Sequence, residues 1–323
     1  MNTSEARKQH LFILWITVFL IVLGLLMWAL QGIIIYGVTT EAEQAPANIP
    51  LAPATIPDKD YGAVVLMYHH IVDDDEFANG IYKGNNAVVP YSQFEEEMTY
   101  LVSQGYITYT MSEAAAMLYN SLPFPKKSVI ITFDDGYASN YEFAYPLLKK
   151  YNLKATIAAV VISSVQAENG GAANQQIPHL TFAQMREMQN SGLIEIGSHS
   201  YDGHGMIATN ASGGMGRYFV SRAYISAETR KETEAEYIER ITQDLRISKE
   251  ILESNLGRPV NYFAYPYGVS ASGVIEALKQ NNFLVAVTTT SGAINQDSNP
   301  FKLNRRNVDQ GISIDKFASL LKK

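Results

Sequence analysis

The sequence predicts an α/β fold, in which a sheet of buried strands is covered by helices. After about residue 60, short apolar runs alternate with longer segments of helical pattern, which is typical of this fold class. Apolar residues make up 47% of the 323 residues, so the chain can bury a core. This length fits a single α/β barrel with a tail, and we therefore expect one folded domain and one anchor segment.

The elements of this domain follow from the pattern in chain order. The predicted strands are the apolar runs at residues 63–68, 128–133, 155–160, 193–197, 262–265 and 285–289. The predicted helices lie between them, at residues 91–103, 141–151, 181–190, 235–255 and 270–280. Two segments rich in glycine and alanine, residues 168–176 and 207–216, are expected to be loops. Loops at one end of a barrel are where substrates meet the reacting groups.

The first forty residues predict a membrane anchor. Residues 11–38 carry no charge and begin with the run LFILWITVFLIVLGLLMWALQGIII, and about 20 helical residues suffice to cross a bilayer. Basic residues precede this run and acidic residues follow it: Arg7, Lys8, Glu41 and Glu43. Because cytoplasmic flanks favour lysine and arginine, we expect a cytoplasmic tail at residues 1–10, a transmembrane helix at residues 11–38 and an extracellular remainder. The alternative is a cleaved signal peptide, which the small residues at 45–47 keep open.

Composition narrows the remaining possibilities. Residues 39–60 hold four prolines and many alanines without apolar periodicity, which predicts a stiff spacer and leaves residues 61–323 as the folded domain. The net charge of −7, with no lysine and arginine cluster after residue 60, argues against a nucleic-acid partner. The chain has no cysteine, which excludes disulfides, cysteine-ligated zinc and thiol nucleophiles. The oligomeric state stays open.

Two adjacent acids end one of the predicted strands. The apolar run at residues 130–133 is followed directly by Asp134, Asp135 and Gly136. At a strand end with a glycine turn, both carboxylates can face one cavity. One could then bind a cation while the other transfers protons. The alternative is an ordinary turn, because aspartate and glycine are common turn residues.

Two further strand ends carry histidines. His199 and His204 follow the run at residues 194–197, and the chain has only six histidines. Imidazole and carboxylate are ligands that zinc and similar ions accept, and catalytic sites keep positions open for water. Together with the acid pair, these residues favour a metal site over a structural role. His69 and His70 end the first strand, where one imidazole could protonate a leaving amine or merely bond the backbone.

These motifs together resemble the polysaccharide deacetylase family, also called the NodB-homology or carbohydrate esterase 4 family. The resemblance covers about residues 62–320 and rests on TFDDG at 132–136, HSYDGH at 199–204 and FAYPYG at 263–268. It implies a deformed (β/α) barrel, with Asp134 as the base that activates a metal-bound water. It also implies that the backbone N–H of Tyr267 helps to hold the oxyanion. The metal ligands implied by the resemblance are Asp135, His199 and His204.

The chain departs from the common family pattern at three points. The metal histidines are five positions apart rather than four, which is similar to the branch that deacetylates poly-β-1,6-N-acetylglucosamine in biofilm matrices. Position 264 is alanine where many members carry arginine, and Arg305 is a candidate to supply that charge, with a surface salt bridge as the alternative. No histidine follows His204, so the resemblance to that branch transfers the role of general acid to His69 in the run MYH at 67–69.

The resemblance implies a metal-dependent hydrolase that removes N-acetyl groups from an extracellular polysaccharide, with zinc as the expected ion and cobalt or nickel as alternatives. No organic cofactor is expected. Peptidoglycan is the alternative substrate, and a non-catalytic wall carbohydrate-binding module is the alternative function. Tyrosines on or beside the motifs could support sugar rings or fill the core: Tyr137, Tyr201, Tyr265 and Tyr267. Residues 205–234 could form a substrate lip or an ordinary surface insertion.

Overall fold

The computed structural model describes residues 62–80, 82, 84–170 and 177–323. The predicted cytoplasmic tail, transmembrane helix and spacer, residues 1–60, lie outside the described residues. The chain divides into two units, Met1–Pro50 and Leu51–Lys323, and all described residues belong to the second. Within those residues, no helix combines the length and the apolar character needed to cross a membrane.

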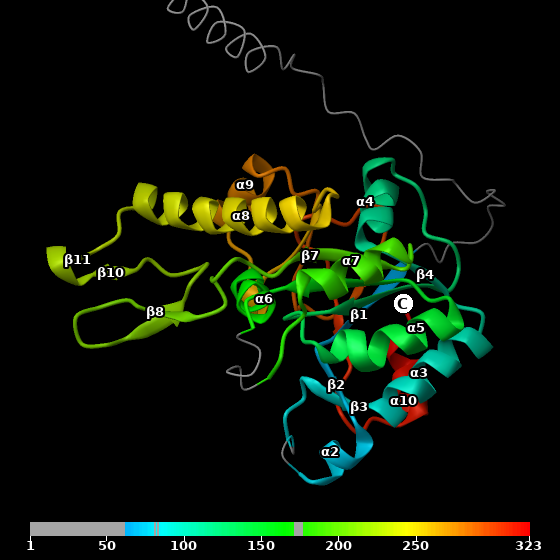
Figure 1. The fold of residues 1–323 in the computed structure, drawn as a ribbon. Coiled ribbons are helices and arrows are strands. Elements are labelled where there is room, and N and C mark those ends of the chain that lie inside the picture. The colour runs from blue at the N-terminus through cyan, green and yellow to red at the C-terminus, as the bar shows by residue number, and fades with distance from the viewer. Residues whose placement is uncertain (1–61, 81, 83, 171–176) are drawn as a thin grey trace, which may run out of the picture. The chain divides into compact units, whose positions relative to one another are not determined.

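A nine-stranded sheet forms the centre of the second unit (Figure 1). Its main strands run parallel to one another in the order β13-β12-β7-β6-β5-β1. Their bounds are β1 (Ala63–Tyr68), β5 (Ser128–Phe133), β6 (Ala155–Ala159), β7 (Ile194–Ser198), β12 (Tyr262–Ala264) and β13 (Val285–Val287). Two shorter strands also join the sheet: β4 (Ile107–Tyr109) pairs with β5, and β14 (Ala293–Ile294) pairs with β1.

The C-terminal segment joins the two ends of this sheet. Leu303 forms a parallel bridge with Val287 of β13. Three residues later, β15 (Arg306–Asn307) pairs in parallel with β1, where Arg306 lies opposite Leu66. The sheet therefore closes on itself through a strand that is only partly regular, which is the deformed (β/α) barrel expected from the sequence.

Helices cover the outside of the barrel, as Figure 1 shows. They are α3 (Tyr91–Ser103), α5 (Tyr145–Tyr151), α6 (Val161–Glu168), α7 (Phe182–Asn190), α8 (Glu234–Leu256), α9 (Ser272–Gln280) and α10 (Ile314–Leu320). A further helix, α4 (Met111–Tyr119), packs on the inner core and donates backbone N–H bonds to Thr156 and Glu195, near the starts of β6 and β7. The opposite end of the barrel, at the C-terminal ends of the strands, holds the candidate functional site.

The predicted strands and helices are all present. Most of their ends lie within two residues of the predicted ends. The predicted helix at 141–151 begins as a π-helical turn, Asn140–Ala144, before α5. The segment 207–216 is not simply a loop as expected, because β8 (Met206–Ala208) and β9 (Met215–Arg217) pair there as an antiparallel hairpin. Further short elements are α2 (Asp74–Ala78), β2 (His70–Val72), β3 (Val88–Pro90), β10 (Tyr224–Ile225) and β11 (Arg230–Lys231).

Candidate metal centre and active site

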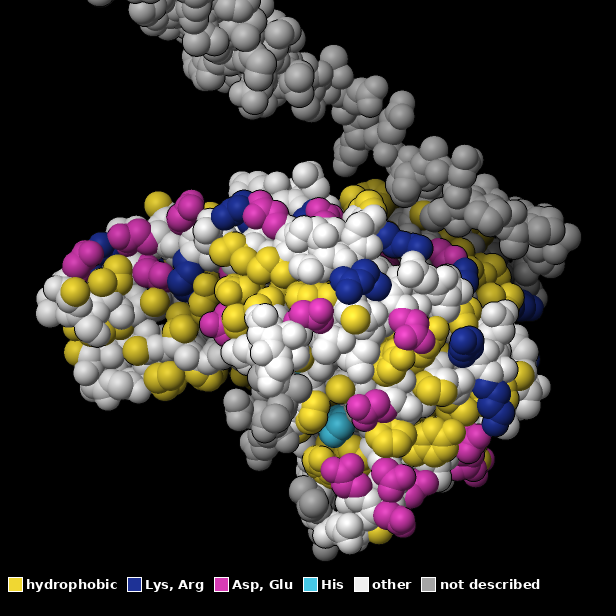
Figure 2. Space-filling model, viewed as in Figure 1, with side chains coloured by type: hydrophobic (Ala, Val, Ile, Leu, Met, Phe, Trp, Pro, Cys, Tyr) yellow, Lys and Arg dark blue, Asp and Glu magenta, His cyan; other side chains and the backbone are white. Residues whose placement is uncertain are grey.

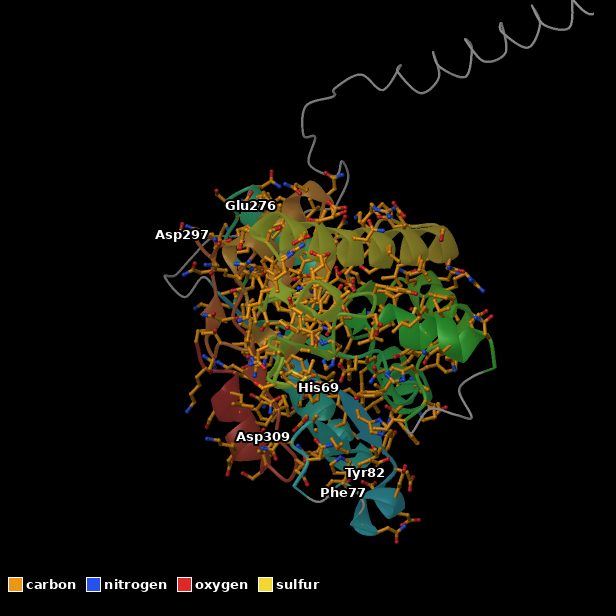
Figure 3. All side chains as sticks on the ribbon, turned by 90° about the vertical axis from the view of Figure 1, so that its left-hand side faces the viewer. His69, Phe77, Tyr82, Glu276, Asp297 and Asp309 are labelled. Atoms are coloured by element: carbon orange, nitrogen blue, oxygen red, sulfur yellow. The ribbon has the colours of Figure 1, made fainter. Side chains whose placement is uncertain are left out.

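Strand alternation delivers the first reacting groups to the inside of the barrel. In β5, Val129, Ile131 and Phe133 belong to the outer core beneath the helices, whereas Ile130 belongs to the inner core. Because successive side chains point to opposite faces, Asp134 continues the inward series. The same parity applies to β1, where Val64, Leu66 and Tyr68 are outer residues, so His69 faces inward. His69 and Asp134 are thereby brought to the same end of the barrel, and Figure 3 marks His69.

A tight turn places the second acid beside the first. Asp135 and Gly136 both have left-handed backbones, with φ of 70° and 72°. Such a conformation is unfavourable for a residue with a side chain, and Asp135 adopts it at the site itself. A Cβ at position 136 would lie 2.9 Å from Cβ of Ala159, so only glycine fits there without displacement. The turn explains why two consecutive carboxylates share one cavity.

Asp135, His199 and His204 come together as a possible ion-binding group, with ligand atoms all within 4.8 Å of one another. Oδ1 of Asp135 lies 3.4 Å from Nε2 of His199 and 3.5 Å from Nε2 of His204. This oxygen is buried and has no hydrogen-bond partner among the described residues. A buried oxygen without a donor is costly, and a cation between these three atoms would satisfy it. The residues therefore fit a divalent ion held by one carboxylate and two imidazoles.

Backbone contacts orient both histidines. Nδ1 of His199 lies 2.8 Å from the carbonyl oxygen of Ala264, which favours a proton on Nδ1 and leaves Nε2 free to bind an ion. Burial lowers the pKa of His199, so the neutral form is favoured. Between the two histidines, the backbone N–H groups of Tyr201 and Asp202 each donate to Asp244 at 2.9 Å. Asp244 thus holds the loop that carries the ligands.

Arg305 meets Asp134 in a buried ion pair. Two of its nitrogens lie 2.7 Å from the two carboxylate oxygens, and its Nε donates to the carbonyl of Thr288 at 2.9 Å. The residue is 1% exposed, so the alternative of a surface salt bridge does not hold. Burial by itself would raise the pKa of Asp134, but Arg305 outweighs it and holds that pKa well below its usual range. Asp134 is therefore an ionised, fixed carboxylate.

The two N-terminal histidines have different surroundings. Nε2 of His69 lies 4.0 Å from Oδ2 of Asp134, and its side chain is 20% exposed. Burial lowers the pKa of His69, with partial compensation from the two aspartates. His70 is turned away toward Ser139, whose Oγ lies 2.6 Å from its Nδ1, and burial lowers its pKa to about 4. Only His69 faces the acid pair.

The predicted tyrosines divide into two groups. Tyr265 is fully buried and donates its hydroxyl to the carbonyl of Phe301, so it belongs to the core, against which Tyr201 also packs. Burial and the neighbouring charge of Asp135 raise the pKa of the Tyr137 hydroxyl well above its usual range, so Tyr137 lies beside the site. Tyr267 has a left-handed backbone, with φ of 59°, and its hydroxyl bonds the carbonyl of His204 at 2.6 Å. Its amide N–H has no acceptor among the described residues.

Comparison with known proteins points to one family. Residues 121–286 match the family model described as polysaccharide deacetylase. YxkH of Bacillus subtilis is 30% identical over 257 residues, which cover 80% of this chain and 75% of YxkH. The poly-β-1,6-N-acetyl-D-glucosamine N-deacetylase of Staphylococcus aureus MSSA476 is 29% identical, over 84% of this chain and 86% of its own. The protein of that name in Escherichia coli K12 is 30% identical, but the chain spans only 35% of its length.

Solved structures give the same answer for the fold. A de-N-acetylase from Aggregatibacter actinomycetemcomitans superposes with a TM-score of 0.71 at 27% identity, covering 80% of this chain and 99% of that one. The deacetylase domain of BpsB from Bordetella bronchiseptica superposes with a TM-score of 0.65 at 26% identity, covering 79% of this chain and 98% of that one.

Proposed function

Because the chain belongs to the polysaccharide deacetylase family, and is thus a hydrolase of N-acetyl groups on polysaccharides, we propose that its substrate is a poly-β-1,6-N-acetylglucosamine. The observation that carries the proposal is the buried Asp134–Arg305 pair beside the Asp135, His199 and His204 group. Relatives in two bacteria are named for this substrate. The five-position interval between the histidines and the N-terminal position of His69 support the same choice.

Asp135, His199 and His204 would hold a divalent metal ion. One carboxylate and two imidazoles suit zinc, with cobalt or nickel as alternatives, because the type and geometry of the ligands determine which metal ion a site prefers. When bound, the ion supplies Lewis acidity, which lowers the pKa of a water and polarises the acetyl carbonyl. The carbonyl of Ala264 holds His199 in the required orientation.

The remaining chemistry belongs to the protein's own side chains. Asp134, aligned by Arg305, accepts the proton of the attacking water on a carboxylate oxygen. The unpaired N–H of Tyr267 stabilises the negative charge that develops on the acetyl oxygen. Because its lowered pKa keeps His69 neutral at rest, the proton that it gives to the departing amine arrives through Asp134, whose Oδ2 lies 4.0 Å away. Acetate leaves, and the sugar keeps a free amine.

We also propose that the enzyme works outside the cell on a single N-terminal anchor. The support is the uncharged run at residues 11–38, with basic residues before it and acidic residues after it. An anchor would keep the site near polymer emerging from the cell surface. Protease added to intact cells should digest residues 61–323 and leave the chain's anchor in the membrane fraction. Digestion only after lysis would contradict this orientation.

Acetate release from the full-length chain tests the function. The substrates are acetylated β-1,6-glucosamine oligomers and peptidoglycan fragments, each with zinc or cobalt, and the matched variant is Asp134→Asn. We expect release from the β-1,6 oligomers by the wild type and at least a hundredfold slower release by the variant, since a positioned base contributes about 10²–10⁴-fold. Preferential release from peptidoglycan would replace the substrate. Bound metal and bound oligomer without any release would identify a non-catalytic carbohydrate-binding module.

A further inference from the structure

The segment between the second metal histidine and α8, residues 205–232, is a fixed part of the domain, which we call the lobe. It projects beside α8 in Figure 1. Phe219 anchors it in the core, with its ring 5.8 Å from that of Phe263. Arg240 of α8 donates to the carbonyls of Tyr218 and Ser221 and forms an ion pair with Glu232. The lobe is therefore held in place by contacts with the core and with α8.

One face of the lobe's hairpin is apolar and exposed. In the register of β8 and β9, Met206 lies opposite Arg217 and Ala208 opposite Met215, so these four side chains share a face. Met206 is 48% exposed and Met215 57% exposed. Figure 2 shows hydrophobic side chains on this projecting part of the molecule. We call the face made by Met206, Ala208, Met215 and Arg217 the hairpin strip.

The hairpin strip reaches the metal centre through Arg217. Its guanidinium carbon lies 5.0 Å from the ring centroid of Tyr267, and that ring lies 4.7 Å from the ring of His204. The hydroxyl of Tyr267 also bonds the His204 carbonyl, so strip and metal ligand are joined by one side chain. A molecule extending from the reacting position past Tyr267 would meet the strip next.

The charge of Arg217 has no carboxylate partner among the described residues. Its side chain makes no hydrogen bond or ion pair with any described residue, although it carries five N–H donors. Two carboxylates of the lobe and the start of α8 pair with other arginines, Glu232 with Arg240 and Glu236 with Arg230. An exposed guanidinium stacked on a ring beside the site is placed to donate to a ligand.

We propose that the hairpin strip binds the sugar next to the one being deacetylated and selects a neighbour that still carries its N-acetyl group. This proposal rests on the proposed function and deepens it. The acetyl methyl suits the thioethers of Met206 and Met215, and the acetamide carbonyl oxygen accepts from Arg217. A neighbour that has already lost its acetyl group carries an ammonium, which Arg217 repels. Each reaction therefore disfavours the next one beside it, and the product is deacetylated at spaced positions.

Two oligomers and two substitutions test this selection. The substrates are a fully acetylated β-1,6-linked glucosamine pentamer and the same pentamer with one internal free amine, both assayed below the pKa of that amine. We expect the wild type to prefer the fully acetylated pentamer about tenfold in kcat/KM. Arg217→Gln, which keeps a planar donor without charge, should reduce this preference to about twofold. Arg217→Lys, which keeps the charge, should retain most of it.

A second arm isolates the apolar part of the strip. Met215→Ser should lower kcat/KM for the pentamer by about threefold to tenfold while leaving the reaction of the acetylated monosaccharide unchanged, because the monosaccharide does not reach the strip. The matched control is Arg246→Gln on the exposed side of α8, where the arginine pairs with Glu250. It should behave as wild type on every substrate. All of these positions are exposed, and unchanged circular dichroism spectra would show that the variants fold.

The outcomes separate the two proposals. Acetate release with the same preference in the wild type and Arg217→Gln overturns the selection by Arg217 and leaves the proposed function intact. Equal loss by Met215→Ser on pentamer and monosaccharide assigns the residue a structural role and overturns the strip as a subsite. Absence of both release and binding of either pentamer overturns the proposed function, and the inference with it.

Discussion

The buried pair of Arg305 and Asp134 makes a quantitative prediction about stability. Both side chains are almost fully buried, and the contact is bidentate at 2.7 Å. Removing one partner leaves the other charge buried and unpaired, which costs about 3–5 kcal/mol. Arg305→Met and Asp134→Asn should therefore each destabilise the domain by this amount. The double variant removes both charges and should cost only about 1–2 kcal/mol, so the coupling energy should exceed about 3 kcal/mol.

Denaturant unfolding of the four proteins at pH 7 measures this coupling. Circular dichroism is the suitable signal, because both tryptophans, Trp15 and Trp28, fall in the predicted anchor. The control cycle uses Arg246 and Glu250 on α8, whose side chains are 45% and 59% exposed. That pair should couple by only about 0.3–0.5 kcal/mol. If the destabilisation in the Arg305 and Asp134 cycle is additive, the ion pair does not hold the base, and the reasoning fails.

Three further predictions concern pH, metal and the turn. Burial raises the pKa of Glu97 from about 4.5 to about 7, so the folded state favours its protonated form. The free energy of unfolding should therefore fall by roughly 3 kcal/mol between pH 4.5 and 7. Glu97→Gln should flatten that part of the pH profile of unfolding. Zinc at 100 times its Kd should stabilise the wild type by about 2.7 kcal/mol in a thermal shift assay, and a comparable shift in Asp135→Ala would locate the ion elsewhere. Gly136→Ala should destabilise by about 2–3 kcal/mol, since φ is +72° and its Cβ would clash with Ala159; a stability equal to wild type would show that the turn relaxes.

The sequence predicts the barrel strands well because most of them are short, largely apolar runs that are buried on both faces. Helix α4 is not predicted because its run, MSEAAAMLY, is short and half of its buried residues are alanines. The short strand β15 gives no signal at all, since its two residues are Arg306 and Asn307. Its pairing with β1 depends on contacts across more than two hundred positions, which local pattern cannot supply.

The same distinction applies to the site. Asp134, Asp135, His199 and His204 were predicted because their residue types are unusual at strand ends, and the structure brings them together. Arg305 could be named only as one of two interpretations, because its partner is fixed by barrel closure and not by spacing. Asp244 and Arg217 are not predicted from the sequence, because aspartate and arginine are ordinary residue types on any protein surface. Their roles depend on which neighbour each one meets.

The loop between the two metal histidines is in direct contact with the lobe. This loop contains Gly203, where a Cβ would lie 2.3 Å from the ring of Phe219, so the lobe's anchoring residue packs directly against the ligand loop. On the other side, Asp244 of α8 holds the same loop by two backbone bonds. A larger side chain at position 203 would displace Phe219, and with it the hairpin that carries Arg217. Gly203 thus provides the close approach between the ligand loop and the lobe, and substitutions there should disturb metal affinity and oligomer preference together.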